Sequence, residues 1–133
     1  MFRSSSLTPS STFERSIISC CFFTIPDNSS VISHNRDIIS SGVIGEVTAV
    51  TANLNYAISE VERIRKPELA GGALLDVGVY TINFASMVLG DKLKDVQATA
   101  IFREGVDMLD TIAMVFEGDR MAVSYTHLTL PTT

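Results

Sequence analysis

Residues 69–90 form one long apolar stretch that opens on adjacent glycines and ends at Gly90, which an aspartate follows. The stretch predicts a single helix, because a glycine directly after the last apolar residue is a common helix stop. Three polar side chains interrupt it at i, i+4 and i+7, which places them on one side of a helix: Asp76, Tyr80 and Asn83. Since the remaining faces are apolar, we expect a buried helix whose one polar stripe meets internal partners or a ligand.

The segments around this helix alternate between helical and extended patterns. A short helix is expected from Val31 to Gly42, and apolar residues at every second position predict four strands: residues 46–56, 96–102, 109–116 and 121–123. The last three strands are joined by short turns, which only antiparallel neighbours allow. The predicted fold class is therefore α+β, with a mostly antiparallel open sheet and its helices on one face.

The two ends of the chain differ in pattern from its middle. Residues 1–30 are crowded with serine and threonine and keep no helical or strand period, so we expect a poorly ordered or non-native lead-in. Residues 124–133 do not continue the strand pattern and resemble the translated adapter sequence found at the ends of some metagenomic reading frames. We expect a non-native tail there and a partial domain over residues 31–123.

Charge and composition narrow the classes of partner. Ten Lys and Arg against fifteen Asp and Glu give a net charge of −5, which argues against a nucleic-acid or membrane partner and suits a neutral small molecule. The cysteines Cys20 and Cys21 are adjacent, a spacing that rarely forms a disulfide or a metal site, so we expect reduced thiols and a cytoplasmic protein. His34 and His127 have no partner at ligand spacing, and no metal site is expected.

Two motifs carry a family resemblance. They are Gly-Gly-Ala-Leu-Leu-Asp-Val-Gly-Val-Tyr at residues 71–80 and Ser-Gly-Val-Ile-Gly-Glu-Val at residues 41–47. In order and spacing they resemble the Gfo/Idh/MocA family of NAD(P)-dependent oxidoreductases, and the similarity runs from about residue 36 to about residue 123. Tyr80 stands where many relatives have histidine, which makes the chain most similar to the dihydrodiol dehydrogenase and glucose-fructose oxidoreductase branch.

The resemblance implies an enzyme of which this chain holds only part. Family members join an N-terminal Rossmann domain, which binds the cofactor, to a C-terminal α+β domain whose open sheet often builds a subunit interface. The chain contains neither Gly-x-Gly-x-x-Gly nor the Glu-Lys-Pro motif of the family's catalytic lysine, and Lys66 stands in the wrong place for that role. We expect a truncated C-terminal domain without the Rossmann domain, and a homo-oligomer formed through the open sheet. NAD or NADP would serve the intact enzyme without binding tightly to this chain, and its cofactor-binding residues are not assigned.

The resemblance also implies roles for individual residues. Tyr80 matches the acid/base position at the substrate alcohol, and Asp76, the other expected catalytic residue, matches the one that contacts substrate hydroxyls. A carboxylate accepts hydrogen bonds from two hydroxyls at once, which suits a sugar, a polyol or a cyclic trans-dihydrodiol. Asn83 is expected to complete this substrate-binding wall, and Arg63 to approach the substrate or the cofactor.

The residues by themselves leave other interpretations open. Without the motif, Asp76 would be a carboxylate near a helix end and Tyr80 a core aromatic with its hydroxyl satisfied. The adjacent glycines would then indicate only close helix packing. The functional alternative is a non-catalytic oligomerisation or interaction module with an exposed sheet, because unpaired sheet edges associate readily.

Overall fold

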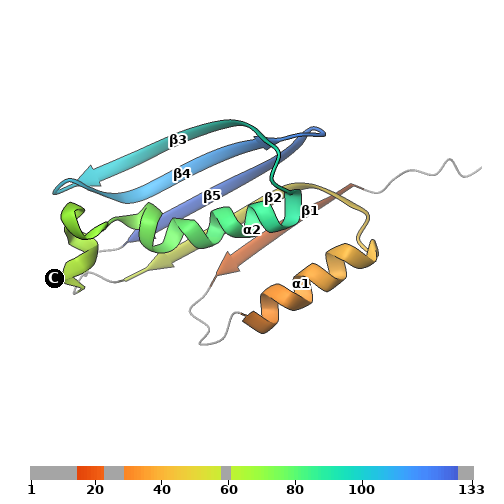
Figure 1. Ribbon diagram of the computed structural model, residues 1–133, viewed down its shortest axis with the longest axis horizontal. Coiled ribbons are helices and arrows are strands. Elements are labelled where there is room, and N and C mark those ends of the chain that lie inside the picture. Colours follow the sequence, from red (N-terminus) through yellow and green to blue (C-terminus); the bar gives the residue numbers. More distant parts are fainter. Residues whose placement is uncertain (1–14, 23–28, 58–60, 129–133) are drawn as a thin grey trace, which may run out of the picture.

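The computed structural model describes residues 15–22, 29–57 and 61–128. These residues form a five-stranded sheet with both α-helices on the same face (Figure 1). The strands are β1 (Arg15–Phe22), β2 (Glu46–Tyr56), β3 (Leu93–Arg103), β4 (Val106–Phe116) and β5 (Arg120–Leu128). The helical elements are α1 (Ser29–Ser41), the short turns η1 (Glu62–Arg65), η2 (Pro67–Leu69) and η3 (Leu74–Gly78), and α2 (Val79–Leu89).

The sheet is mixed, with the strand order β1-β2-β5-β4-β3. β3, β4 and β5 pair antiparallel, as their short turns predict, whereas β1 and β5 both pair parallel with β2. The predicted α+β class is confirmed, but the description of the sheet as mostly antiparallel is wrong. Parallel neighbours need a long crossover connection. In the sequence, α1 connects β1 to β2, and α2 with the β3–β4 hairpin connects β2 to β5.

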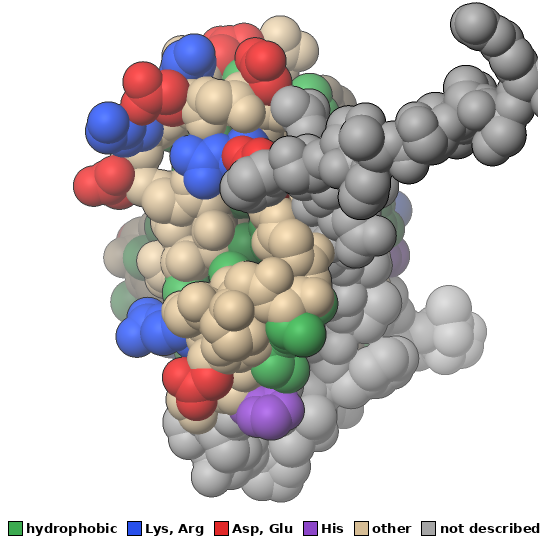
Figure 2. All heavy atoms as spheres, turned by 90° about the vertical axis from the view of Figure 1, so that its right-hand side faces the viewer, with side chains coloured by type: hydrophobic (Ala, Val, Ile, Leu, Met, Phe, Trp, Pro, Cys, Tyr) green, Lys and Arg blue, Asp and Glu red, His purple; other side chains and the backbone are tan. Residues whose placement is uncertain are grey.

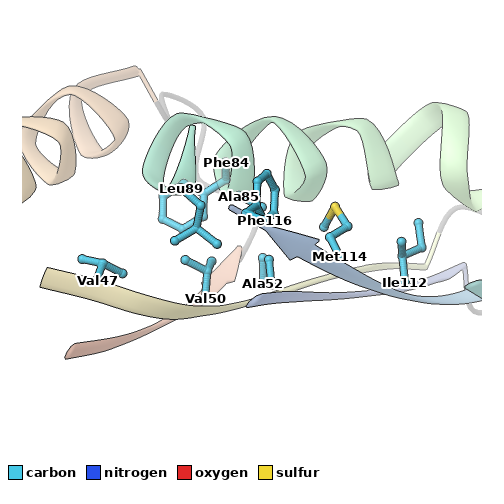
Figure 3. Packing of buried hydrophobic residues seen from close by; sticks show 10 residues of the cluster. Val47, Val50, Ala52, Phe84, Ala85, Leu89, Ile112, Met114 and Phe116 are labelled. Carbon is cyan, nitrogen blue, oxygen red and sulfur yellow. The ribbon is translucent and has the colours of Figure 1, made fainter. Parts of the chain in front are cut away.

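The main core lies between α2 and the sheet. Figure 3 shows Phe84, Ala85 and Leu89 of α2 pointing toward the side chains of β2 and β4. On β2, Val50 and Ala52 face the helix at alternate positions, as the sequence pattern predicts. A second buried cluster joins the helical segment before α2 and η1 to the strands: Leu54, Ile64, Ala73, Val77, Val106, Met108 and Leu128.

The helix predicted over residues 69–90 is divided in the structure. A π-helical turn, η3, leads into α2, and α2 ends before Gly90, whose φ of 90° fits the predicted stop. By length and composition, Pro67–Leu89 is apolar enough to cross a membrane, with a mean hydropathy of 1.5, but its inner side packs on β2 and β5. Its outer side exposes Leu75 and Val79, so the expectation of a helix buried on all its apolar faces is wrong.

Two strand predictions at the ends of the chain are also wrong. Residues 15–22 form β1, although no strand is predicted before residue 31. β5 continues to Leu128 instead of ending at residue 123, because its inward polar residues Ser124 and Thr126 are buried with hydrogen-bond partners. The rest of the predicted lead-in and tail lies outside the described residues, apart from Ser29 and Ser30, which begin α1. The non-native origin of residues 124–133 stays a prediction.

β3 is an edge strand that the helices leave uncovered. Ten of its eleven residues are exposed, on both faces of the strand. The exposed large apolar side chains along it are Leu93, Val96, Ile101 and Phe102. Among the described residues α2 covers β2 and β5, so an apolar edge remains open beyond β4.

Leu89→Ala and Leu93→Ala form a matched pair that tests the location of the core. Leu89 is 1% exposed against the sheet and Leu93 is 48% exposed on β3. We expect Leu89→Ala to lower the free energy of unfolding by about 2–5 kcal/mol, because it leaves a cavity. Leu93→Ala should change it by less than about 0.5 kcal/mol. Urea unfolding of both variants measures the difference, and equal losses would contradict this core.

Candidate functional site

Two glycines guide the chain into the helical segment. A Cβ atom on Gly71 would overlap the carbonyl oxygen of Ile64, and Gly72 donates its N–H to that same oxygen at 2.9 Å. Gly72 also has a φ of 114°, a backbone conformation that glycine adopts without strain. This close approach holds η1, which carries Arg63, against the start of the helical segment.

Arg63 and Asp76 form an ion pair at this point. The guanidinium Nη2 of Arg63 donates a hydrogen bond to Oδ1 of Asp76, which lies in the π-helical turn. The Arg63 side chain is half exposed and that of Asp76 mostly covered. The structure therefore joins two of the residues that the sequence places in the site, and leaves the guanidinium accessible from the surface.

Tyr80 and Asn83 lie on the exposed outer side of α2. Tyr80 is 59% exposed, and the described residues offer its hydroxyl no hydrogen-bond partner. The alternative interpretation of Tyr80 as a core aromatic with a satisfied hydroxyl is therefore wrong. No hydrogen bond within the described part of the chain links Tyr80 or Asn83 to Asp76. Both side chains are free to meet a ligand.

A buried pair of hydroxyls fixes how α2 sits on the sheet. Thr81 donates its hydroxyl hydrogen to the carbonyl oxygen of Gly78 at 2.7 Å, and its Oγ1 lies 2.5 Å from Oγ of Ser124 on β5. Since the Thr81 hydrogen is already used, Ser124 is the donor in the second bond. Thr81 faces the sheet directly after Tyr80, so this contact keeps Tyr80 turned outward.

Two carboxyl groups of β4 lie beneath the start of the helical segment. Asp107 accepts a hydrogen bond at 2.6 Å from the backbone N–H of Leu74, and its Oδ1 occupies the space that a Cβ atom on Gly72 would fill. Asp110 is only 5% exposed. Burial raises the pKa of Asp110 from 3.8 to about 7, and two effects of Asp107 add to it. The protonated Asp110 donates a hydrogen bond to Asp107, and the negative charge of Asp107 disfavours a second charge beside it.

Neither carboxyl group is among the site residues expected from the sequence. Asp107 falls in the predicted turn between residues 102 and 109, and Asp110 falls in the predicted strand 109–116. A signal was nevertheless present in β4. Asp110 stands between Met108 and Ile112 on the inward face of the strand, where the alternate positions are otherwise apolar. A single carboxyl group on a buried face requires a partner, and this pattern would have predicted one.

The opposite end of α2 carries charges of both signs, and Figure 2 shows acidic and basic side chains side by side on that face. There Nζ of Lys92 lies 3.2 Å from Oε2 of Glu117, at an open groove that Leu89 and Arg120 also line. Tyr80 does not line this groove, so the groove is separate from the candidate site. Within the described ranges, no group of three His, Cys, Asp or Glu side chains could hold a metal ion.

Comparison with known families decides the classification. The family model described as the GFO/IDH/MocA C-terminal domain matches residues 32–131, a range that contains Arg63, Asp76, Tyr80 and Asn83. The chain belongs to this family. The resemblance found in the two glycine-containing motifs is thereby confirmed, and the match continues past residue 123, where sequence reasoning ends the domain.

Individual relatives in the Gfo/Idh/MocA family are oxidoreductases by name. The chain is 38% identical over 88 residues to trans-1,2-dihydrobenzene-1,2-diol dehydrogenase of Danio rerio, covering 65% of this chain and 26% of that protein. It is 42% identical over 60 residues to dTDP-3,4-didehydro-2,6-dideoxy-alpha-D-glucose 3-reductase of Streptomyces violaceoruber, covering 44% and 18%. The chain thus spans about a quarter of the length of the dihydrodiol dehydrogenases it matches.

Solved structures share the fold. Aldose-aldose oxidoreductase from Caulobacter crescentus, complexed with glycerol, aligns with a TM-score of 0.68 at 19% identity, over 75% of this chain and 32% of that one. A 3-ketoreductase from Actinomadura kijaniata, in complex with NADP and TDP-benzene, aligns with a TM-score of 0.67 at 24% identity, over 77% and 32%. At these identities the likeness establishes the α+β fold of the domain.

The buried carboxyl group predicts a specific pH dependence of stability. Because folded Asp110 keeps its proton up to about pH 7 and an unfolded aspartate loses it near pH 4, its contribution to the free energy of unfolding falls between these values. By this linkage the loss is roughly 2–4 kcal/mol. Asp110→Asn should remove this decline, since an amide does not titrate.

Urea unfolding from pH 4 to pH 8 measures this effect as the difference between wild type and Asp110→Asn. Asp95→Asn, which changes an exposed aspartate on β3, is the control and should keep the wild-type profile. Identical profiles for wild type and Asp110→Asn would contradict the assignment of the proton to Asp110.

Proposed function

We propose that this chain is part of an NAD(P)-dependent oxidoreductase that acts on a CH–OH group of a sugar, a polyol or a cyclic diol. Family membership and the names of the dehydrogenase and reductase relatives support this proposal. The observation that carries it is the outward Tyr80 hydroxyl, which has no partner among the described residues and lies one helical turn from the Arg63–Asp76 ion pair.

In this proposal the side chains on the outer side of the helix share the work at the substrate. Tyr80 acts as the phenolate in oxidation and takes the proton that leaves the substrate hydroxyl. The phenol formed in this way returns the proton in the reverse reaction. Asp76 binds neighbouring substrate hydroxyls through the acceptor positions that Arg63 leaves open. Arg63 holds that carboxylate in place. Asn83 lies on α2, on the same side of the helical segment as Asp76 and Tyr80, and adds a further polar contact for the substrate.

The described residues fit the reacting end of a nicotinamide cofactor and not its phosphates. When bound, the cofactor would exchange a hydride with the carbinol carbon of the substrate. Leu75 and Val79 expose apolar surface next to Tyr80, on which a nucleotide-binding domain would close and exclude water. Because the sequence lacks Gly-x-Gly-x-x-Gly, we place the phosphate-binding residues outside this chain. The weak cofactor binding of this chain alone and its cytoplasmic setting stay predictions.

Tyr80→Phe in the longer protein that contains this chain tests the proposed role of the phenol. We expect the turnover number to fall about 100- to 10,000-fold, because the proton acceptor is lost. The thermal midpoint should not change, since the hydroxyl has no partner among the described residues. Absorbance of reduced nicotinamide with xylose, glucose and a benzene dihydrodiol measures turnover. Tyr56→Phe, which removes a phenol hydroxyl at the end of β2, is the control; undiminished turnover in Tyr80→Phe would end the assignment.

We further propose that the uncovered β3 edge joins two copies of the chain. The exposed apolar residues of β3 support this, because a large apolar patch on a sheet edge invites association. Association through β3 is compatible with catalysis. It is also what the alternative function requires, a non-catalytic oligomerisation module in which the outer side of α2 has no chemical role.

Phe102→Lys tests this interface by sedimentation velocity. Phe102 is exposed on β3, and a charge at its position should convert a dimer to a monomer. Val43→Lys places the same charge at an exposed site after α1, away from β3, and should leave the dimer intact. A wild-type chain that sediments as a monomer would contradict the proposal.

A further inference from the structure

The start of the helical segment is held by a side chain from another part of the chain. The first N–H groups of a helix have no partners within it, and no side chain beside η3 in sequence provides a cap. Instead Asp107 reaches across from β4 and accepts the Leu74 N–H at 2.6 Å. Its other oxygen lies against Gly72, where any residue with a Cβ atom would displace it. Asp107 therefore determines where the segment begins.

A second carboxyl group supports Asp107. The side chains of Asp110 and Asp107 are hydrogen-bonded to each other, and two carboxyl groups can share a hydrogen bond only when one of them holds a proton. Asp110 is the more deeply buried of the two and holds it. Asp107 acts on Asp110 as a negative charge. A carboxylate is the form that binds most strongly to N–H groups at a helix start.

We propose that Asp107 is a positioning residue for the candidate site and that the proton on Asp110 keeps its carboxylate directed at the Leu74 amide. Asp76 follows Leu74 by two residues, and Tyr80 begins the next turn. A shift of the helix start moves both side chains, and a displacement of about 1 Å is enough to impair catalysis. This inference rests on the proposed function in one respect: the two residues that Asp107 positions, Asp76 and Tyr80, are those proposed to act on the substrate.

Other charged groups near the pair are engaged elsewhere or turned away. On η3, Asp76 is bonded to Arg63, and on the loop after β3, Glu104 is bonded to Arg65. On β5, Thr126 lies opposite Asp110 and bonds to it at 3.4 Å, whereas the next residue, His127, belongs to the opposite face because strand side chains alternate. On β3, the residues opposite Asp110 and Asp107 are Ala100 and Phe102, which carry no charge.

This arrangement makes the helix start sensitive to pH. Among the described residues, only Asp107 and Thr126 act on the Asp110 carboxyl besides its burial. When Asp110 loses its proton, two like charges face each other beneath η3 and the shared hydrogen bond is lost. Asp107 then moves away from Asp110, and its bond to the Leu74 amide weakens.

Proton–nitrogen NMR spectra of the 133-residue chain between pH 5 and pH 9 test this inference. In wild type we expect the Leu74 amide proton to lie downfield and to shift upfield across a transition near pH 7. In Asp107→Asn it should lie upfield at every pH. Proton–carbon spectra of the same samples should show the Asp76 carboxyl and Tyr80 ring signals shifted as well. Asp110→Asn keeps a hydrogen-bond donor beside Asp107, so the downfield signal should remain and its transition should vanish.

Asp95→Asn is the control and should reproduce the wild-type titration. A Leu74 amide that Asp107→Asn leaves unchanged, or a transition that persists in Asp110→Asn, would overturn the inference. If Asp107→Asn does not fold, Asp110→Asn alone decides. These spectra need neither substrate nor cofactor, so a failure here is distinct from a failure of the Tyr80→Phe activity test.

Discussion

The packing of one side of α2 against β2 and β5 holds the candidate site in place. Phe84, Ala85 and Leu89 are buried against the sheet, and the buried hydroxyl contact between Thr81 and Ser124 fixes the rotation of the helix. The opposite side must then face outward, with Tyr80 exposed on it. Burial of the apolar side of α2 therefore sets the outward direction of the Tyr80 side chain, although Tyr80 is not itself buried among the described residues.

Polar contacts set the position of the helix along its axis. Gly71 and Gly72 let the backbone pass close to the Ile64 carbonyl, and Asp107 accepts a hydrogen bond from the Leu74 N–H. The same approach brings Arg63 to Asp76. An ion pair whose guanidinium is half exposed adds little to stability, so the pair matters here because it holds the Asp76 carboxylate at a defined place.

Features that depend on neighbouring residues could be predicted from the sequence, and features that depend on distant ones could not. The bounds of β2, the stop at Gly90 and the outward stripe follow from local period and glycine chemistry. The parallel pairing of β1 with β2, the cap from Asp107 and the buried hydroxyl of Ser124 depend on contacts far apart in sequence, and the local pattern carries no record of them. The buried polar residues Ser124 and Thr126 interrupt the apolar pattern of β5, so the part of the strand beyond residue 123 could not be predicted.

A crystal structure of the longer protein with a nicotinamide cofactor and a sugar or diol is the most direct test of the central claim. The account predicts that the Tyr80 hydroxyl lies within hydrogen-bond distance of the reacting substrate oxygen, and that Asp76, still paired with Arg63, contacts a neighbouring hydroxyl. A complex in which the substrate binds elsewhere and the outer side of α2 stays open to solvent would contradict it.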